Sequence, residues 1–299
     1  GETTRLANEL GIATPHTAVL TSRTDALAFA ETATFPAVLK PRASETANGN
    51  AIRTGGAPAY ARVRQELVDQ AERMIGQVGP VLAQEYVEGS GVGYFALMSN
   101  GELRCEFAHR RIRDVRPTGS GSSVRESTRP DPEVREAGLA ILNALRWHGV
   151  AMVEFRKRPD GTPVFLEVNG RFWNSLALAI YAGADFPRLL ADLAQHGDVA
   201  PSLDYQVGVQ CRWLLGDARH LAAVLRGPPK TFTGRFPSRW RTLLAVFTPV
   251  PGMHHDNFVL DDPLPEVADW LDFLTRRVPR HLTPRRPAGD PPVAVRARG

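Results

Sequence analysis

Cysteine, lysine and long apolar runs are scarce or missing in this sequence. The two cysteines, Cys105 and Cys211, are far apart and fit no spacing typical of metal ligands. No stretch of about 18 or more apolar residues occurs, and no secretory apolar segment is present. We therefore expect no membrane span and no signal peptide, and we expect a reduced, cytoplasmic setting.

Two common nucleotide-binding signatures are also missing. The chain contains neither a G-x-x-x-x-G-K-[ST] loop nor a G-x-G-x-x-G turn after a first strand. This argues against P-loop and Rossmann sites. Lysine occurs only at Lys40, Lys157 and Lys230, so each one stands out more than it would elsewhere.

What is present describes a globular protein whose positive charge lies at one end. The 299 residues, 43% hydrophobic and 23% charged, suffice for one large or two ordinary domains with a sizeable core. The net charge is +4, but residues 276–299 hold seven arginines against one aspartate, a net +6, so the rest carries −2. We interpret this Pro- and Arg-rich stretch as a disordered basic tail, which argues against a nucleic-acid groove.

The stretch 149–175 contains a predicted hairpin that opposes two glutamates. Asp160-Gly161 is a strong turn signal, because glycine tolerates the positive φ of tight turns, and the flanks "AMVEF" and "VFLEVN" have strand composition. With a two- or four-residue loop, Glu154 faces Glu167. The other opposed pairs in this register are Met152–Asn169, Arg156–Phe165, Val153–Val168 and Phe155–Leu166. A three-residue loop would shift it.

Two opposed carboxylates need compensation, because like charges directly across a strand pair are destabilising. Asn169 lies two residues beyond Glu167 on the same face, so two carboxylates and an amide oxygen converge. Hard oxygen ligands of this kind suit Mg²⁺, which uses one or two carboxylates together with substrate phosphates. The alternative is a solvated polar face in which Arg156 and Arg171 neutralise the acids.

Strand and helix signals along the chain predict an α+β fold. Residues 59–76 have helical periodicity, and "PVLAQEYVEGSGVGYFALMSNGELRCEFAHRRI" contains three strands with a turn at Asn100-Gly101. "RPTGSGSSVRES" is expected to be a Gly/Ser loop. Strands paired into hairpins, with helices interspersed, favour α+β over a doubly wound parallel sheet.

Six segments resemble, in this order, the ATP-grasp superfamily: "GIATPHT", "FPAVLKP", "VLAQEYVEG", "GVAMVEF", "FLEVNGRFW" and "LAIYAGADFP". The superfamily includes D-alanine–D-alanine ligase, biotin carboxylase and carbamoyl-phosphate synthetase. The resemblance covers about residues 1–197 and implies a small lobe at about 18–90 and a large lobe at about 91–197. ATP would lie between their antiparallel sheets. We expect a C-terminal α/β extension at 198–275 and the basic tail at 276–299.

The resemblance implies a nucleotide site made of Lys40, Ser44, Gln84, Glu85, Tyr86, Val87 and Glu88. Lys40 would bind ATP phosphate oxygens, and the loop that holds Ser44 would fold over them. Gln84 and the main chain of 85–87 would read adenine, and Glu88 is a weak substitute for the ribose-binding acid of relatives. The alternatives are a surface lysine, a mobile loop and a plain strand.

The resemblance also implies the metal and catalytic groups. Glu154, Glu167 and Asn169 would hold two Mg²⁺ ions, or Mn²⁺, that bridge the ATP phosphates. Arg171 would stabilise charge on the transferred phosphoryl group, with Lys40 beside it. A further set, Arg110, Arg111 and Arg113, lies where relatives place anion-binding groups; the alternative is a solvated arginine face. His109 is interpreted as structural.

The implied reaction is that of an ADP-forming ligase that joins a carboxylate to an amine through an acyl phosphate. One alternative is activation of bicarbonate to carboxyphosphate, although no biotinyl-lysine segment or glutaminase triad is visible. Relatives carry an α/β subdomain before "GIxTP", so the chain resembles a truncated member. A nucleotide-binding fragment without activity is therefore a second alternative. We expect small-molecule carboxylate and amine substrates, no nucleic acid and no membrane partner, and the resemblance allows a homodimer.

Overall fold

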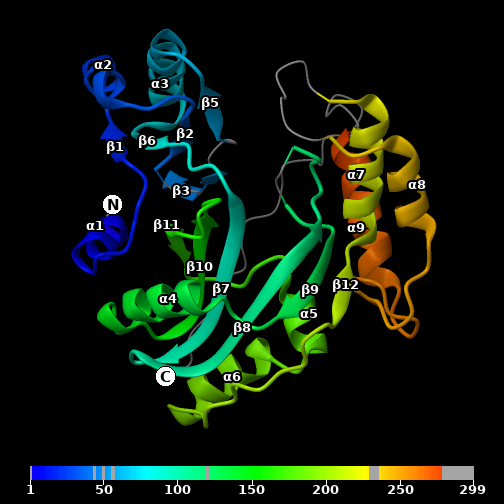
Figure 1. Ribbon diagram of the computed structural model, residues 1–299. Coiled ribbons are helices and arrows are strands. Elements are labelled where there is room, and N and C mark those ends of the chain that lie inside the picture. The colour runs from blue at the N-terminus through cyan, green and yellow to red at the C-terminus, as the bar shows by residue number, and fades with distance from the viewer. Residues whose placement is uncertain are drawn as a thin grey trace, which may run out of the picture. The chain divides into compact units, whose positions relative to one another are not determined.

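The computed structural model describes residues 2–42, 45–48, 51–54, 58–118, 121–228 and 236–277. The chain divides into two compact units. The first comprises Gly1–Arg113, Val124–Cys211 and Val250–His254, and the second comprises Asp114–Ser123, Arg212–Pro249 and His255–Gly299. Figure 1 shows helices together with separate sheets, so the predicted α+β class is confirmed.

A small antiparallel sheet in the first unit has the strand order β1 (Thr17–Leu20), β6 (Val81–Glu85), β2 (Ala37–Pro41), β5 (Ala59–Ala61). Helices α2 (Arg23–Thr32) and α3 (Arg64–Val78) pack on one face. Ala37 and Leu39 of β2 are buried against them, so Val38 and Lys40 occupy the other face, because side chains alternate along a strand.

The predicted helix at 59–76 is wrong at its start. Residues Ala59–Ala61 pair with Leu39–Ala37 of β2 as a strand, and α3 begins only at Arg64. Pairing with a neighbouring strand overrides the helix preference of alanine here. A separate two-stranded sheet is formed by β3 (Glu45–Asn48) and β4 (Ala51–Thr54).

The large sheet has the strand order β11 (Pro163–Asn169), β10 (Gly149–Lys157), β7 (Ser90–Ser99), β8 (Glu102–Arg113), β9 (Val124–Thr128), β12 (Gln210–Arg212), β13 (His254–His255). The predicted turn between β7 and β8 is confirmed: Asn100 and Gly101 have φ of 52° and 94°, as a two-residue primed turn requires. The predicted Gly/Ser loop is too long, because residues from Val124 onwards pair with β8 as β9.

Two helical layers cover the large sheet. Helices α1 (Glu2–Glu9) and α4 (Pro132–Ala144) pack on one face, where Tyr94 and Phe155 are buried. Helices α5 (Leu176–Tyr181) and α6 (Phe186–His196) contribute to the core on the other face, around Phe95 and Phe107. The register puts Met152 and Glu154 on the same face of the sheet as Phe95. Glu154 therefore lies on the face that carries this second core.

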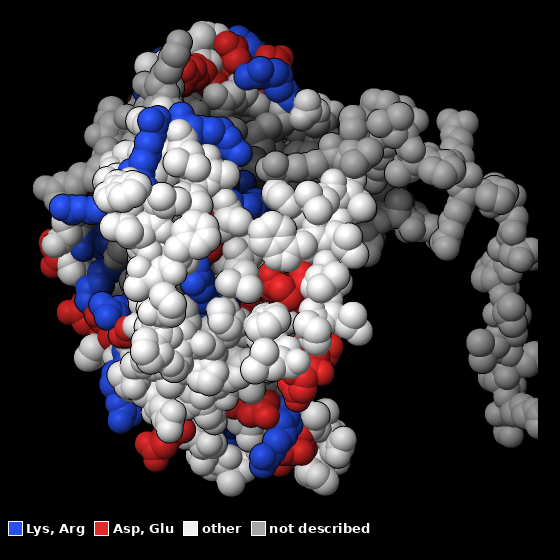
Figure 2. All heavy atoms as spheres, turned by 90° about the vertical axis from the view of Figure 1, so that its right-hand side faces the viewer, with Lys and Arg blue, Asp and Glu red and all other residues white. Residues whose placement is uncertain are grey.

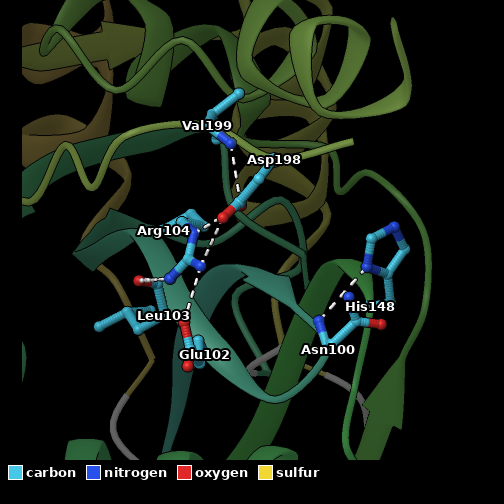
Figure 3. A network of polar contacts seen from close by, with 7 residues as sticks. All are labelled: Asn100, Glu102, Leu103, Arg104, His148, Asp198 and Val199. Carbon is cyan, nitrogen blue, oxygen red and sulfur yellow. Dashed lines mark hydrogen bonds and ion pairs between the residues drawn. The ribbon is translucent and has the colours of Figure 1, made fainter. Parts of the chain in front are cut away.

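An arginine fork ties the large sheet to the segment that follows α6 (Figure 3). Arg104 Nε and Nη2 donate to the two carboxylate oxygens of Asp198 at 2.7 and 2.8 Å, and Nη2 also donates to Glu102 at 2.7 Å. The planar guanidinium suits this two-pronged geometry, which a lysine could not reproduce. The fork holds the chain after α6 against β8.

The described residues of the second unit include the helices α7 (Leu214–Arg226), α8 (Arg239–Phe247) and α9 (Leu264–Arg277). Within it, Arg212 pairs with the buried Asp217 at 2.5 Å. Among the helices of the described ranges, none is long and apolar enough to cross a membrane.

Candidate active site

The hairpin of β10 and β11 brings the two predicted glutamates together. Glu154 pairs with Glu167, and Met152 pairs with Asn169, as the sequence predicts. Further toward the turn the register differs, because Phe155 pairs with Phe165 and not with Leu166. The predicted pairing of Arg156 with Phe165 is also wrong, since Arg156 pairs with Val164.

A three-residue loop explains the difference. The Arg158 N–H donates to the Thr162 carbonyl at 3.0 Å, which leaves 159–161 as the loop, and Gly161 has φ of 96°. Such a loop shifts the pairing by one residue. An irregularity between Glu154 and Phe155 shifts it back, so the two glutamates still face each other.

Glu154 stands in an environment unfavourable to its own charge. Burial raises the pKa of this carboxyl, and the charge of Glu167 raises it further. Lys40, Arg111 and Arg171 oppose this effect by lowering it. The pKa of Glu154 is thus raised first by burial and second by the facing carboxylate, and the three nearby cations offset this only in part.

Lys40 reaches this hairpin from the small sheet. Its Nζ lies 3.6 Å from Glu167 Oε2, and its side chain is 21% exposed. The sequence predicted Lys40 as a strand-end cation but gave no contact for it. The contact brings a cation from one sheet and carboxylates from the other to a single place in the first unit.

Asn169 and Arg171 follow at the end of β11. Asn169 Nδ2 donates to Glu167 Oε1 at 3.1 Å, so its amide oxygen is left to turn toward a cation. Arg171 is exposed, and its Nη1 donates to the Phe172 carbonyl at 3.2 Å. The structure thus brings four of the predicted residues, Lys40, Glu154, Glu167 and Asn169, to one place, with the charge of Arg171 close enough to act on Glu154.

Two glycines of β7 lie beside Glu154 and let neighbouring side chains approach the sheet closely. Gly93 of β7 pairs with Glu154, and a Cβ there would approach Phe95 Cζ to 2.9 Å. Arg111 of β8 lies over the next glycine, its Nη1 3.3 Å from the place that a Cβ would take at Gly91. The lack of side chains at Gly91 and Gly93 therefore leaves room for Arg111 and Phe95 beside Glu154, and the charge of Arg111 acts on that carboxyl.

The predicted adenine edge is largely engaged by the fold itself. Gln84 is buried and donates through Nε2 to Thr17 Oγ1 at 3.0 Å. The Glu85 and Tyr86 N–H groups donate to the carbonyls of His16 and Pro36 at 2.8 and 3.3 Å. Base reading by this edge stays a prediction.

Arg156 extends this edge in a way that the sequence did not indicate. Its Nε donates to the Val87 carbonyl at 3.1 Å, and its guanidinium lies 5.8 Å from the Tyr86 ring centre. Tyr60 lies beside Tyr86, with ring centres 6.1 Å apart, and is 56% exposed. The sequence did not indicate a role for Tyr60, because residues 59–76 were predicted to be a helix. Only the pairing of β5 with β2 puts Tyr60 on the same face as Val38.

The structure gives no contact for two of the residues predicted to bind the nucleotide. Ser44 lies outside the described residues, and Glu88 is exposed between β6 and β7. His109 fits its structural interpretation: it stacks on Phe95 with ring centres 5.1 Å apart, and its Nε2 lies 2.8 Å from Ser175 Oγ. Burial and the charges of Arg125 and Arg111 lower its pKa to about 3, so it stays neutral near pH 7.

The oxygen set fits a phosphate-bound Mg²⁺. In the part of the chain that the structure describes, no group of three or more His, Cys, Asp and Glu side chains could hold a metal by itself. Two carboxylates and an amide are instead what Mg²⁺ uses when phosphates and water complete its shell. The raised pKa of Glu154 indicates that a cation here would relieve the repulsion between the two carboxylates.

Comparison with known proteins gives consistent results. A family described as ATP-grasp in the biosynthetic pathway with Ter operon matches residues 77–216. The arginine-specific carbamoyl phosphate synthase large chain of Bacillus subtilis (strain 168) is 24% identical over 233 residues, which cover 70% of this chain and 22% of that protein.

Two solved structures share the architecture. The MgADP- and bicarbonate-bound biotin carboxylase domain of the 2-oxoglutarate carboxylase of Hydrogenobacter thermophilus has a TM-score of 0.53 and 18% identity over 70% of this chain and 48% of its own. Phosphoribosylamine–glycine ligase of Thermotoga maritima has a TM-score of 0.53 and 14% identity over 70% of this chain and 56% of its own.

The chain therefore spans about a fifth of its curated relative and about half of these solved chains. Sequence and fold agree: residues 77–216 match an ATP-grasp family, and the fold is that of the ATP-grasp superfamily.

Proposed function

We propose that the protein is an ADP-forming ligase that uses ATP and Mg²⁺ to join a carboxylate to an amine. The observation that carries the proposal is the pairing of Glu154 with Glu167, with Lys40 of the other sheet 3.6 Å from Glu167. Carboxylates for divalent cations and an ammonium for phosphate oxygens are the groups that a phosphoryl transfer needs.

The nucleotide is proposed to lie between the two sheets of the first unit. Lys40 binds phosphate oxygens, and the faces of Tyr86 and Tyr60 border the base. Glu154, Glu167 and Asn169 would hold Mg²⁺, which supplies charge neutralisation at the phosphates when it is bound.

The reaction needs no enzyme nucleophile. A substrate carboxylate oxygen attacks the γ-phosphorus of ATP, ADP leaves, and an acyl phosphate forms. The amine nitrogen then attacks the acyl carbon, phosphate leaves, and the amine loses a proton as the amide forms. Arg171 and Arg111 would stabilise the negative charge of the transferred phosphoryl group, so the proposed catalysis rests on positioning and electrostatics.

The comparisons support this chemistry at the level of the class. One relative is named a ligase and one a carbamoyl phosphate synthase, while the solved carboxylase domain is bound to MgADP and bicarbonate. All three names are compatible with an ATP-activated carboxylate or bicarbonate. The substrates of this chain are not given by these names.

The test combines nucleotide binding with product analysis. MgADP should raise the melting temperature of the full chain, and MgATP with a panel of carboxylates and hydroxylamine should give a hydroxamate with equal amounts of ADP and phosphate. Release of AMP and pyrophosphate would contradict the proposal. Bicarbonate-dependent ADP release without a hydroxamate would assign the chain to carboxyphosphate chemistry, and MgADP binding without turnover would leave a nucleotide-binding module.

A further inference from the structure

The chain just after β11 carries two residues of the candidate site but has no regular secondary structure. The pairing of β11 with β10 ends at Asn169, and α5 begins only at Leu176. Arg171 therefore lies beyond the last strand pair, and Asn169 lies at it. Groups that bind a metal or a phosphate must be held to within about 0.5 Å of their working positions. Packing has to supply the order that strand pairing does not give here.

The indole ring of Trp147 packs against the backbone between these two residues. A Cβ placed on Gly170 would lie 2.9 Å from Trp147 Cζ2 and 3.1 Å from its Cη2. Trp147 and Val168 both pack against the core on the α4 side of the large sheet, whereas Asn169 lies on the Glu154 side. The ring therefore contacts the chain from the side opposite to the metal and phosphate positions.

The ring explains why residue 170 is a glycine. Its φ lies outside the left-handed region that favours glycine, so the backbone alone would accept any residue. A side chain is excluded because its Cβ would come much closer to the ring than the roughly 3.5–4.0 Å at which carbon atoms pack. Gly170 and Trp147 thus form one contact in which the bare backbone is in direct reach of the indole.

Trp147 is itself held in place. Its Nε1 donates to the Val150 carbonyl of β10 at 3.1 Å, which fixes the ring. Its backbone N–H donates to the Leu142 carbonyl of α4 at 2.9 Å, and its carbonyl accepts from the Gly101 N–H in the turn between β7 and β8 at 2.8 Å. The ring cannot turn away without losing a hydrogen bond, so it is a firm support for the chain that it contacts.

We propose that Trp147 is a positioning residue of the site: its ring fixes the backbone at Gly170 and so sets where Asn169 and Arg171 point. The inference rests on the proposed function, in which Asn169 binds Mg²⁺ and Arg171 the transferred phosphoryl group. A shift at Gly170 would move Asn169, whose Nδ2 donates to Glu167 Oε1 at 3.1 Å, so it would disturb two metal ligands together. Altering groups that orient metal ligands commonly changes metal affinity about 10- to 100-fold.

The test measures ADP affinity of the full 299-residue chain by calorimetry with and without Mg²⁺. The ratio of the two affinities is the readout, because a loss of stability that affects both measurements equally leaves it unchanged. Mg²⁺ should strengthen ADP binding to the unaltered chain. In Gly170→Ala this strengthening should fall about tenfold, since the added methyl group pushes the backbone away from the ring. Trp147→Phe should reduce it too, because the smaller ring no longer supports Gly170.

A double variant tests the contact itself. A phenyl ring at position 147 lacks the atoms corresponding to Cζ2 and Cη2, and an alanine methyl group at position 170 fills part of the space that they leave. The combined variant Trp147→Phe/Gly170→Ala should therefore lose less of the Mg²⁺ effect than the two single losses added together. Fully additive losses would show that the two residues act independently and would overturn the proposal.

Two matched controls separate this role from packing in general. A Cβ at Gly138 of α4 would lie 2.7 Å from Tyr94 Cδ1 in the core on the same side of the sheet. Gly138→Ala should lower the melting temperature without changing the effect of Mg²⁺. Trp240→Phe controls for the loss of an indole: Trp240 is 68% exposed on α8. Figure 2 shows the side of the molecule on which Figure 1 labels α8, where uncharged side chains predominate.

The outcomes distinguish this inference from the proposed function. If Gly170→Ala loses stability as Gly138→Ala does but keeps the full effect of Mg²⁺, Trp147 only packs the core, and the inference is overturned while the proposed function stands. If Gly170→Ala does not fold, Trp147→Phe, which introduces no overlap, decides by the same comparison. If Mg²⁺ does not strengthen ADP binding to the unaltered chain, the metal site of the proposed function is overturned, and the inference with it.

Discussion

Glu154 is the residue whose surroundings oppose its ionisation most clearly within the site. Burial and the facing Glu167 both raise its pKa. A group whose pKa is higher in the folded state contributes stability below its unfolded pKa and loses that contribution as the pH rises through the folded value. At neutral pH the pair therefore costs stability, which is a cost that a binding site can accept and a structural surface has no reason to keep.

We expect Glu154→Gln and Glu167→Gln to separate stability from binding. Without ligand, each variant should melt at the same temperature as the unaltered chain or a few degrees higher, because the repulsion is removed. Affinity for ADP in the presence of Mg²⁺ should fall at least about tenfold, since a hydrogen bond or ligand contact to a charged group contributes roughly 1.5–3 kcal/mol. Calorimetry with and without Mg²⁺ gives the answer. Glu102→Gln, at an exposed position outside the site, is the control, and metal-independent binding that survives both substitutions would contradict the metal assignment.

Lys40 and Lys157 allow a lysine proposed to bind phosphate to be compared with a lysine that stabilises the fold. Lys40→Met should barely change the melting temperature of the free protein but should weaken MgATP binding about 10- to 100-fold, because an ammonium–phosphate contact is lost. Lys157 pairs with Asp131, which caps α4, so Lys157→Met should lower the melting temperature and leave nucleotide binding unchanged. Thermal melting with and without MgATP tests both. A large loss of stability in the free Lys40→Met variant would favour a structural lysine.

At the scale of elements, the hairpin shows how far the sequence can predict a site. Strand composition and the Asp160-Gly161 turn signal predict the hairpin and the pairing of Glu154 with Glu167, but not the loop that the structure has. The observed loop has three residues, whereas the predicted register needs two or four. The irregularity between Glu154 and Phe155 restores the pairing of the two glutamates. Local sequence carries no clear signal for that irregularity, so the pairing nearer the turn could not be predicted. The contact of Lys40 with Glu167 could not be predicted either, since it depends on how two sheets meet.

Glu126 of β9 connects three strands. One carboxylate oxygen accepts from Arg110 of β8 at 2.9 Å, and the other accepts from Gln210 of β12 at 2.7 Å. The hydrogen bond from Gln210, followed by that from Arg110, lowers the pKa of Glu126. A lowered pKa gives stability that is present above the unfolded value, about 4.3, and is lost as the pH falls through the folded value.

We therefore expect Glu126→Gln to melt several degrees lower than the unaltered chain at neutral pH, with the difference shrinking below about pH 4. Melting curves between neutral and acidic pH give the result. Glu136→Gln, at an exposed position of α4, should show no such convergence. A constant difference at all pH values would mean that Glu126 acts by packing and not through its charge.

At the scale of the whole molecule, the sequence predicts the fold of the first unit better than that of the second. The resemblance segments all lie in the first unit, where paired strands and spaced motifs make the fold readable. Residues from about Pro228 to Pro265 mix proline, glycine and aromatics, and there the structure shows α8, which pattern alone did not indicate.

The division into two units has a consequence for ligand binding. The residues of the candidate site all belong to the first unit, whereas α7, α8 and α9 belong to the second. These site residues are Lys40, Glu154, Glu167, Asn169 and Arg171. A ligand stabilises only the cooperative unit to which it binds. We expect calorimetric unfolding of the full chain in two transitions. At about 100 times its dissociation constant, MgADP should raise the transition of the first unit by roughly 5–10 °C, because about 2.7 kcal/mol shifts a domain of this size by that amount. The second transition should not move with MgADP. A single transition that MgADP raises as a whole would show instead that the two units unfold together.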